Sequence, residues 1–305
     1  MEFFKTKTTI NFMGQQKWAA LLSAILCIAS LLSLAIHGLN WGLDFTGGTQ
    51  LQLRYTQAAD LNNIRDTLTK SGFARSVVQS YGTSGEVLIS LPPQKDMSQE
   101  QLTKKIMSVL PGAEVQRAES VGPEVGQELM TKGVLAVVIA LFATMLYVAF
   151  RFEYRFAVSA AVALIHDPVL ILGVFSYFNL EFNLTALAAV LTVIGYSIND
   201  TIVIFDRVRE NFRKMRKETP LEVMNASINQ TLSRTIMTSG TTLLVVVALF
   251  IYGGEMLHGF SLAMMIGIVV GTYSSIYVAG ALAVAMGLNR QDLLPAAKTE
   301  VDDRP

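Results

Sequence analysis

The chain carries one ionisable side chain, Asp200, inside an otherwise uncharged apolar stretch that runs from Leu184 to Phe205. A carboxylate in the hydrocarbon core of a membrane costs about 2.5–3.5 kcal/mol even on the lenient scale taken from insertion experiments. Proteins rarely carry such an acid without a use, and a lone acid among serine, threonine and asparagine is typical of a proton relay. The alternative is a static polar clip that holds helices together, as some buried ion pairs do.

The residues near Asp200 suit a helix interface. Asn199 and Asp200 lie three and four residues after Tyr196, so all three are expected on one helix face. Gly195 would let another backbone approach closely, as small residues do in membrane packing. Arg234 opens a later apolar stretch, and its side chain is long enough to approach a carboxylate about 10 Å inside the membrane face. A contact between Asp200 and Arg234 is therefore feasible.

A second polar point, His166-Asp167-Pro168, lies near the middle of another apolar stretch. Pro168 cannot donate to the carbonyl of Leu164, so it kinks or loosens the helix there. In the plainer interpretation His166 or Asp167 satisfies the freed carbonyl and does nothing more. In the other interpretation, the kink lies beside Asp200 and lets water reach its carboxylate. The supporting polar residues that we predict are Tyr196, Asn199, His166, Asp167, Ser239 and Thr241.

Six stretches are apolar and long enough to cross a bilayer, in a chain that is 51% hydrophobic and 16% charged. The sequence therefore predicts a polytopic α-helical membrane protein. We read the first stretch as an uncleaved anchor, because it is long for a signal peptide and no A-x-A site follows it. The predicted spans are Trp18–Gly38, Gly133–Phe150, Phe156–Phe178, Leu184–Phe205, Ile236–Tyr252 and Leu262–Met286.

The sixth stretch has a small residue at every fourth position, which predicts a smooth stripe for close helix contact. The partner helix is left open, since it belongs either to this chain or to another. The residues predicted to serve helix packing are Gly195, Gly267, Gly271 and Ser275.

Lysine and arginine predict the orientation of the chain. They precede the first span, lie between the second and third, and cluster between the fourth and fifth, whereas the short loops 179–183 and 253–261 have none. The positive-inside rule places such residues in the cytoplasm. We therefore expect both termini to be cytoplasmic, as are a basic segment 206–235 and a tail 289–305. Residues 41–132 would then form an external domain, after an anchor within 1–40 and before the spans in 133–288.

The segment 41–132 is long enough for one small domain. Its strand patterns lie at Thr49–Tyr55, Ser76–Tyr81, Glu86–Leu91 and Glu114–Val121. Helical patterns at Asp60–Ser71 and Ser98–Leu110 separate them, with Ser98 and Gln101 placed as a capping box. The β-α-β-β-α-β order predicts a ferredoxin-like α+β domain.

Several function classes receive no support from the residues. The glycines of TGGTQLQL lack the spacing of a phosphate-binding loop, and no such loop occurs elsewhere, so ATP bound to this chain is not expected as the energy source. Formal net charge is zero, which indicates no nucleic-acid partner. The single cysteine, Cys27, lies in an apolar stretch as a packed residue. We expect no metal, no cofactor and no enzymatic activity.

Four motifs resemble those of the SecD/SecF family of protein-export membrane proteins. They are WGLDFTGGT (41–49), VGPEVG (121–126), GYSINDTIVIFDRVRENFRK (195–214) and RTIMTSGTT (234–242). The resemblance covers essentially the whole chain and is of the SecF type. It implies half of a transporter of the RND superfamily, six helices that pair with SecD into a twelve-helix unit.

The resemblance also implies a location in the bacterial inner membrane, with residues 41–132 in the periplasm, together with partners and a role. The unit would associate with the SecYEG channel, often with YajC, and use the proton-motive force to promote late preprotein translocation. Asp200 would be the essential proton-carrying acid and Arg234 its charge partner. Ionised Asp200 would attract Arg234 and compact the helices, and neutral Asp200 would release it.

Three other classes are weighed against this one. A small-molecule or lipid exporter half of the same superfamily would have a larger external domain with a substrate cleft. An intramembrane aspartyl protease would use Asp167 and Asp200, but that chemistry needs two close acids, and G-x-G-D is absent. A purely structural subunit would not need Asp200 to titrate.

Overall fold

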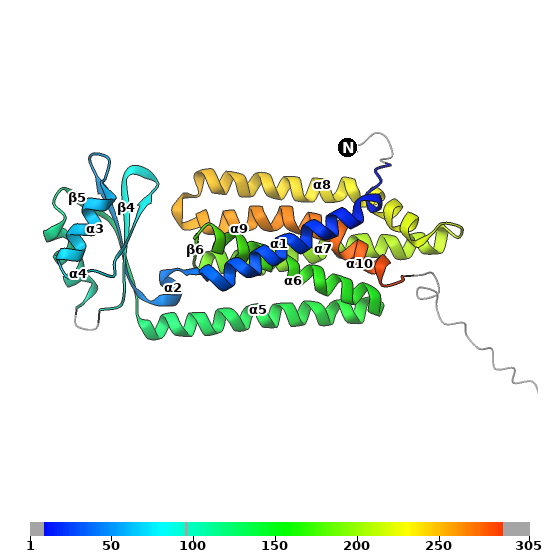
Figure 1. Cartoon of the computed structure of the whole chain (residues 1–305), viewed down its shortest axis with the longest axis horizontal. Helices are drawn as coiled ribbons and strands as arrows, with labels where there is room; N and C mark the ends of the chain where they lie inside the picture. Colours follow the sequence, from blue (N-terminus) through cyan, green and yellow to red (C-terminus); the bar gives the residue numbers. More distant parts are fainter. Residues whose placement is uncertain (1–8, 95–96, 289–305) are drawn as a thin grey trace, which may run out of the picture.

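The computed structural model describes residues 9–94 and 97–288. Six long helices form a bundle, and a small α+β domain stands at one end of it (Figure 1). Both described ends of the chain lie at the opposite end of the bundle (Figure 1). The bundle helices are α1 (Gln16–His37), α5 (Pro123–Arg151), α6 (Tyr154–Tyr177), α7 (Leu184–Lys214), α8 (Pro220–Tyr252) and α9 (Gly254–Tyr273). A 3₁₀ turn (Met13–Gln15) precedes α1, and a π-helical turn, η2 (Ser274–Ala279), joins α9 to α10 (Gly280–Ala285).

All six predicted membrane helices are present, and three extend well beyond the predicted spans. Helix α5 begins at Pro123 rather than Gly133, α7 continues to Lys214, and α8 begins at Pro220 rather than Ile236. A hydropathy window detects only the apolar part of a helix, whereas the polar ends are fixed by caps. Pro at the first helical position starts both α5 and α8, and a Thr219–Glu222 capping box supports α8.

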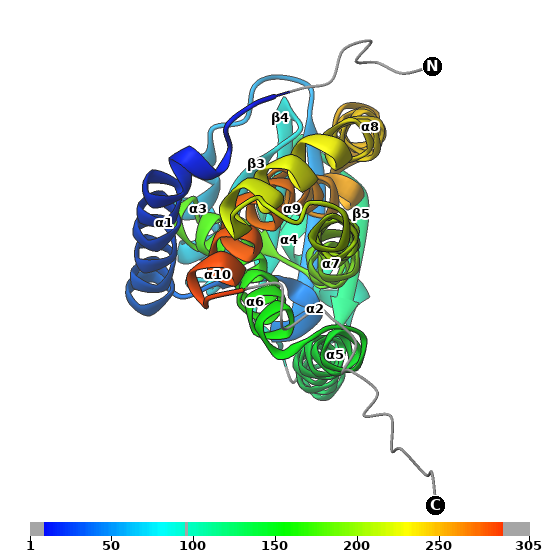
Figure 2. The same ribbon diagram turned by 90° about the vertical axis from the view of Figure 1, so that its right-hand side faces the viewer.

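Helices α1, α5 and α8 lie at the periphery of the bundle (Figure 2). Half or more of the apolar window is buried in α6, α7 and the span that contains α9, whereas less than a fifth is buried in α1, α5 and α8. Helix α9 approaches α7 closely where Gly267 meets Val193, because a Cβ on Gly267 would lie 2.2 Å from Val193 Cγ2. Asp200 is therefore carried by a helix of the interior.

The α+β domain has the predicted β-α-β-β-α-β order, which confirms that part of the predicted fold. Its antiparallel sheet has the strand order β3-β4-β2-β5, that of a ferredoxin-like split unit. The predicted capping box of Ser98 and Gln101 opens α4. The elements are β2 (Gly48–Tyr55), α3 (Leu61–Lys70), β3 (Val77–Tyr81), β4 (Thr83–Leu91), α4 (Gln99–Val109) and β5 (Ala113–Val121).

The two faces of this sheet differ in chemistry. Alternate residues such as Leu51, Leu53 and Ile89 are fully buried against α3 and α4. The intervening residues, Gln50 and Gln52 among them, belong to the other face, which is turned toward the bundle. The sheet therefore presents polar side chains to the end of the membrane helices.

Domain and bundle meet at what we call the joint, formed by residues 40–48 and the strand β6 (Glu181–Phe182). Strand β1 (Asn40–Trp41) pairs with β6 in parallel, and the single-turn helix α2 (Leu43–Thr46) follows. Neither of these short strands nor α2 was predicted. Each is too short for a periodic pattern to reveal it.

Two glycines of the motif WGLDFTGGT are needed for the joint to close. Gly47 and Gly48 have φ of 66° and 126°, which favours glycine. A Cβ on Gly48 would lie 2.2 Å from the carbonyl oxygen of Leu91, and one on Gly126 would lie 2.9 Å from the amide nitrogen of Gly47. The glycines of WGLDFTGGT and VGPEVG therefore allow the backbones of the joint and α5 to contact each other directly.

Candidate functional site

Asp200 lies on α7 in the bundle interior and is only 5% exposed. Its Oδ1 accepts one long hydrogen bond, 3.3 Å, from Thr235 Oγ1 on α8. Its Oδ2 is buried and has no hydrogen-bond partner among the described residues. A buried carboxylate normally collects several donors, because desolvation of its charge is costly. A carboxyl group with one weak donor is poorly suited to hold a fixed charge and well suited to gain and lose a proton.

Arg234 does not contact Asp200 in this arrangement. It is exposed, and no ion pair joins it to Asp200 among the residues that the structure describes. Consecutive helix residues point about 100° apart, so Thr235 faces α7 while Arg234 turns outward. Asp200 therefore contacts Thr235 instead of Arg234, the neighbouring residue that the sequence made feasible as its partner.

Two of the predicted supporting residues join three helices. The Tyr196 hydroxyl on α7 donates to Ser239 Oγ on α8 at 3.4 Å, and Ser239 lies 2.8 Å from Thr272 Oγ1 on α9. Asn199 and Thr241 are exposed, and Thr241 donates to the carbonyl of Met237 in its own helix. The structure thus brings together Tyr196 and Ser239 but not the other two.

Asp167 is far better satisfied than Asp200. It is 1% exposed, and its Oδ1 lies 2.9 Å from His166 Nδ1. Its Oδ2 accepts hydrogen bonds from Ser197 of α7 (2.5 Å) and Ser274 of η2 (2.9 Å). Among the described residues neither His166 nor Asp167 bonds to the carbonyl freed by Pro168, so the plainer interpretation of this motif receives no support.

The predicted packing residues divide into two groups. Gly267 and Gly271 face α7, since a Cβ on Gly271 would lie 3.0 Å from the Cβ of Ser197. Ser275 is fully buried in η2. Gly195, in contrast, is exposed, and within the described chain nothing lies within 4 Å of an added Cβ. It offers a surface to the outside of this bundle.

Sequence reasoning missed three polar residues that contact these sites. Thr235 and Ser197 bond to the two buried acids, and Asp44 Oδ2 accepts a hydrogen bond from the Leu184 amide at 2.8 Å. Ser197 lies three residues before Asp200, so helix spacing could have indicated its contact with the interior. Asp44 lies inside the motif WGLDFTGGT, but no local pattern could indicate its contact with Leu184, which is 140 residues later in the chain.

No group of three or more His, Cys, Asp or Glu side chains is placed to hold a metal ion in the part of the chain that the structure describes. The arrangement offers instead one poorly partnered acid in the bundle and a joint that connects the bundle to a polar sheet. Together these features define a six-helix membrane protein with an extramembrane ferredoxin-like domain after its first helix.

Comparison with known families agrees with that class. The family described as protein export membrane protein SecD/SecF, C-terminal, matches residues 101–289, and the SecD/SecF GG motif matches residues 32–59. The chain therefore belongs to the SecD/SecF family.

Relatives and solved structures extend the match over the whole fold. The chain is 50% identical to the protein translocase subunit SecF of Vibrio alginolyticus, covering 96% of this chain and 95% of that one. It is 47% identical to that of Pseudomonas aeruginosa, covering 97% and 98%. A crystal structure of a Thermus SecDF, titled a translocon-associated membrane protein, superposes with a TM-score of 0.85 at 40% identity. The chain spans 93% of its own length in that match and 40% of the longer SecDF chain.

Proposed function

We propose that this chain is a SecF-type subunit of the Sec protein-export machinery that, with SecD, uses the proton-motive force to promote late preprotein translocation. The relatives named protein translocase subunit SecF and the translocon-associated SecDF support the export role and the SecD partner. The family resemblance adds the SecYEG channel and YajC as further partners. The single observation that carries the coupling to protons is the buried Asp200 with one weak donor.

The proposed cycle uses Asp200 as the proton carrier. When the carboxyl is neutral, the present arrangement with Thr235 costs little. When it ionises, the charge needs a cation, and our candidate is Arg234, the residue just before Thr235 on α8. Rotation or translation of α8 against α7 would then bring Arg234 toward the ionised Asp200. A proton that moves down 100 mV supplies about 2.3 kcal/mol, enough to bias a two-state rearrangement.

Helix α7 offers a direct connection from this site to the joint. Asp200 lies sixteen residues after Leu184, so about 24 Å of continuous helix separates the buried acid from the end capped by Asp44. A shift of α7 would move the joint and the ferredoxin-like domain with it. We place that domain on the periplasmic side of the inner membrane and both termini in the cytoplasm, since the lysine- and arginine-rich loops lie at the other end of the bundle.

Enzymatic activity is not part of the proposal. An aspartyl protease needs two acids that share a proton. In the described chain, Asp167 bonds to His166, Ser197 and Ser274, and Asp200 bonds to Thr235, so the two acids share no hydrogen bond.

The test is Asp200→Asn in vesicles that contain the chain with SecD, the channel and its ATPase. We expect proton-motive-force-dependent export of a preprotein to be lost while assembly with SecD is retained. Asp206→Asn is the matched control, because Asp206 is on the same helix but is only half-buried and is paired with Arg151. Undiminished gradient-driven export by Asp200→Asn would overturn the proposal, and export of a dye instead of preprotein would favour the small-molecule alternative.

A further inference from the structure

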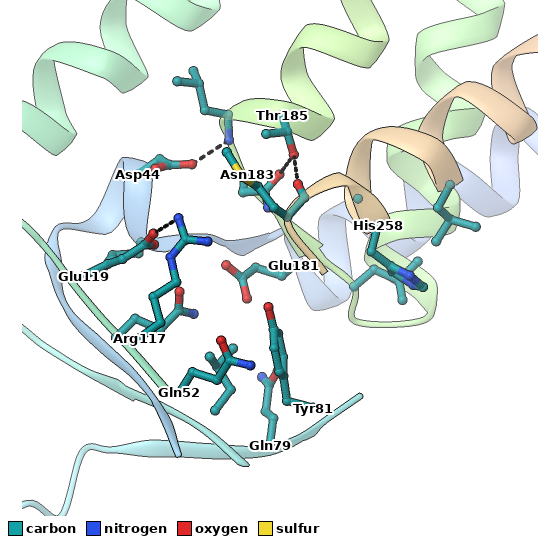
Figure 3. Close-up of a pocket in the computed structure, with 18 of the residues that line it drawn as sticks. Asp44, Gln52, Gln79, Tyr81, Arg117, Glu119, Glu181, Asn183, Thr185 and His258 are labelled. Carbon is teal, nitrogen blue, oxygen red and sulfur yellow. Dashed lines mark hydrogen bonds and ion pairs between the residues drawn. The ribbon is translucent and has the colours of Figure 1, made fainter. Parts of the chain in front are cut away.

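A cavity of about 420 Å³ lies between the polar face of the sheet and the near end of the bundle (Figure 3). One wall consists of side chains from β2, β3 and β5. The other consists of the joint, the start of α7 and the start of α9. The cavity therefore separates the two parts of the molecule that would move relative to one another.

Glu181 projects into this cavity from the bundle side (Figure 3). Its backbone is fixed by the pairing of β6 with β1 and by the hydrogen bond from the Gly42 amide to the Phe182 carbonyl, 2.9 Å. Its carboxyl lies against Gly42, since a Cβ there would be 3.0 Å from Glu181 Oε1. A side chain at position 42 would therefore crowd the carboxyl of Glu181, and glycine leaves that space free.

The groups that face Glu181 are mostly acidic or neutral. Among the described residues that line the cavity, Arg117 is the one lysine or arginine, and it already forms an ion pair with Glu119 on the same strand (Figure 3). Within this lining Glu181 therefore has two acids near it and no ion pair with a cation. The titratable groups around the cavity are Asp44 from α2, Arg117 and Glu119 from β5, Tyr81 from β3 and His258 from α9, while β2 and α7 contribute uncharged side chains.

These surroundings favour the neutral form of Glu181. Burial raises the pKa of its carboxyl above the ordinary value of 4.5, and the charge of Asp44 raises it further. A hydrogen bond with Gln50 lowers the pKa, and Glu119 raises it. Asp44 itself stays bound to the Leu184 amide, so its negative charge is held in place beside Glu181.

We propose that Glu181 is a second proton-binding site of this chain, where the bound proton holds the ferredoxin-like domain against the bundle and its loss opens the cavity between them. Ionised Glu181 repels Glu119 across the cavity, and opening the cavity lets water reach Glu181, Glu119 and Asp44. The site depends on equilibrium protonation at the joint and not on proton transfer through Asp200.

The direction of the pH effect follows from linkage. Well below its ordinary value of 4.5, Glu181 is neutral in both the closed and the open arrangement and favours neither. Above the raised pKa it is ionised in both, and only the closed arrangement is penalised. The closed form is therefore lost as pH rises through the window between 4.5 and the raised pKa. Each unit by which the pKa is raised changes the ratio of closed to open about tenfold.

The test measures the distance between domain and bundle in the full chain, assembled with SecD in lipid nanodiscs. Spin labels are placed at Asp66→Cys on α3 and Tyr252→Cys at the end of α8, both exposed, in a Cys27→Ser background. Pulsed dipolar spectroscopy then gives the distance distribution between about pH 5 and about pH 8. We expect a longer-distance population that grows with pH in the parent chain. In Glu181→Gln, which mimics the neutral acid, the short distance should persist at every pH.

Two further variants sharpen the experiment. Glu100→Gln is the matched control, since Glu100 is exposed on α4 and pairs with Lys104, and it should titrate like the parent. Asp44→Asn removes one repelling charge but keeps an acceptor for the Leu184 amide, so its midpoint should shift to lower pH. A distance that does not respond to pH in the parent, or a response that survives in Glu181→Gln, would overturn the proposal. Asp200→Asn should leave the response intact, which separates this site from the proposed proton pathway.

Discussion

Asp44 Oδ2 lies 2.8 Å from the backbone nitrogen of Leu184, so a residue of the joint caps the helix that carries Asp200. Asn183 caps the same helix by accepting from the Ala186 amide, so two different amides of the first turn are satisfied. Asp44→Ala should lower the free energy of unfolding by about 1 kcal/mol, the usual value of an N-terminal cap. Thermal unfolding in detergent would measure this loss. Asp44→Asn should retain most of the stability, and equal losses in both variants would refute the capping role.

Gly48 is the most constrained glycine of the joint, and we predict that it does not tolerate alanine. Its φ of 126° is rarely adopted by L-residues, and the added Cβ would lie 2.2 Å from the Leu91 carbonyl oxygen. Gly48→Ala should destabilise the ferredoxin-like domain by about 1–3 kcal/mol. Limited proteolysis and thermal unfolding would report the loss. The matched control is Gly122→Ala, at an ordinary φ of −65° with no atom within 4 Å of the new Cβ in the described chain, and it should be nearly neutral.

The contact between α7 and α9 predicts opposite outcomes at two glycines. A Cβ on Gly267 would meet Val193 at 2.2 Å, so Gly267→Ala should cost about 1–3 kcal/mol through overpacking. Gly195→Ala places its methyl group on an exposed surface and should leave the stability of the isolated chain unchanged. Unfolding of both purified variants in detergent gives the comparison. If Gly267→Ala were as stable as the parent, the close packing of these helices would be in doubt.

Glu86 should make the ferredoxin-like domain sensitive to acid. Hydrogen bonds from Arg54 and from the Thr83 backbone hold the pKa of the Glu86 carboxyl below its ordinary value of 4.5. A depressed pKa contributes stability that is present above 4.5 and is lost as pH falls through the lower, folded-state pKa. Glu86→Gln should therefore reduce the difference between the free energies of unfolding at about pH 7 and about pH 3. Unfolding curves of both proteins at a series of pH values measure it, and parallel pH profiles would contradict the prediction.

The sequence was most informative where a pattern repeats over many residues. The bundle helices could be predicted from long apolar stretches, and the β-α-β-β-α-β order from apolar residues that recur at a fixed period, as Leu51 and Leu53 do in β2. The ends of α5, α7 and α8 were misjudged because polar turns continue a helix that hydropathy no longer marks. Local caps such as Thr219 could have corrected one of them.

The site was harder to predict because its contacts join distant segments. The acid Asp200 could be found from its own isolation in an apolar stretch. Its hydrogen-bond partner could not be predicted. Arg234 and Thr235 are adjacent on α8, and the rotation of that helix determines which of the two faces Asp200. The joint depends on Asp44 and Glu181, whose neighbours lie more than a hundred residues away and leave no periodic signal.

The outward direction of Gly195, Asn199 and Arg234 has a consequence for how this protein persists in a cell. These residues lie within or beside the membrane-spanning parts of α7 and α8, and Asn199 and Arg234 present polar groups to whatever surrounds the bundle. Polar side chains in contact with acyl chains are costly, so in membrane proteins they normally face other helices or water. A copy without a partner subunit thus leaves these polar groups on its flank uncovered. We expect such a copy to be less stable in the membrane than one paired with SecD.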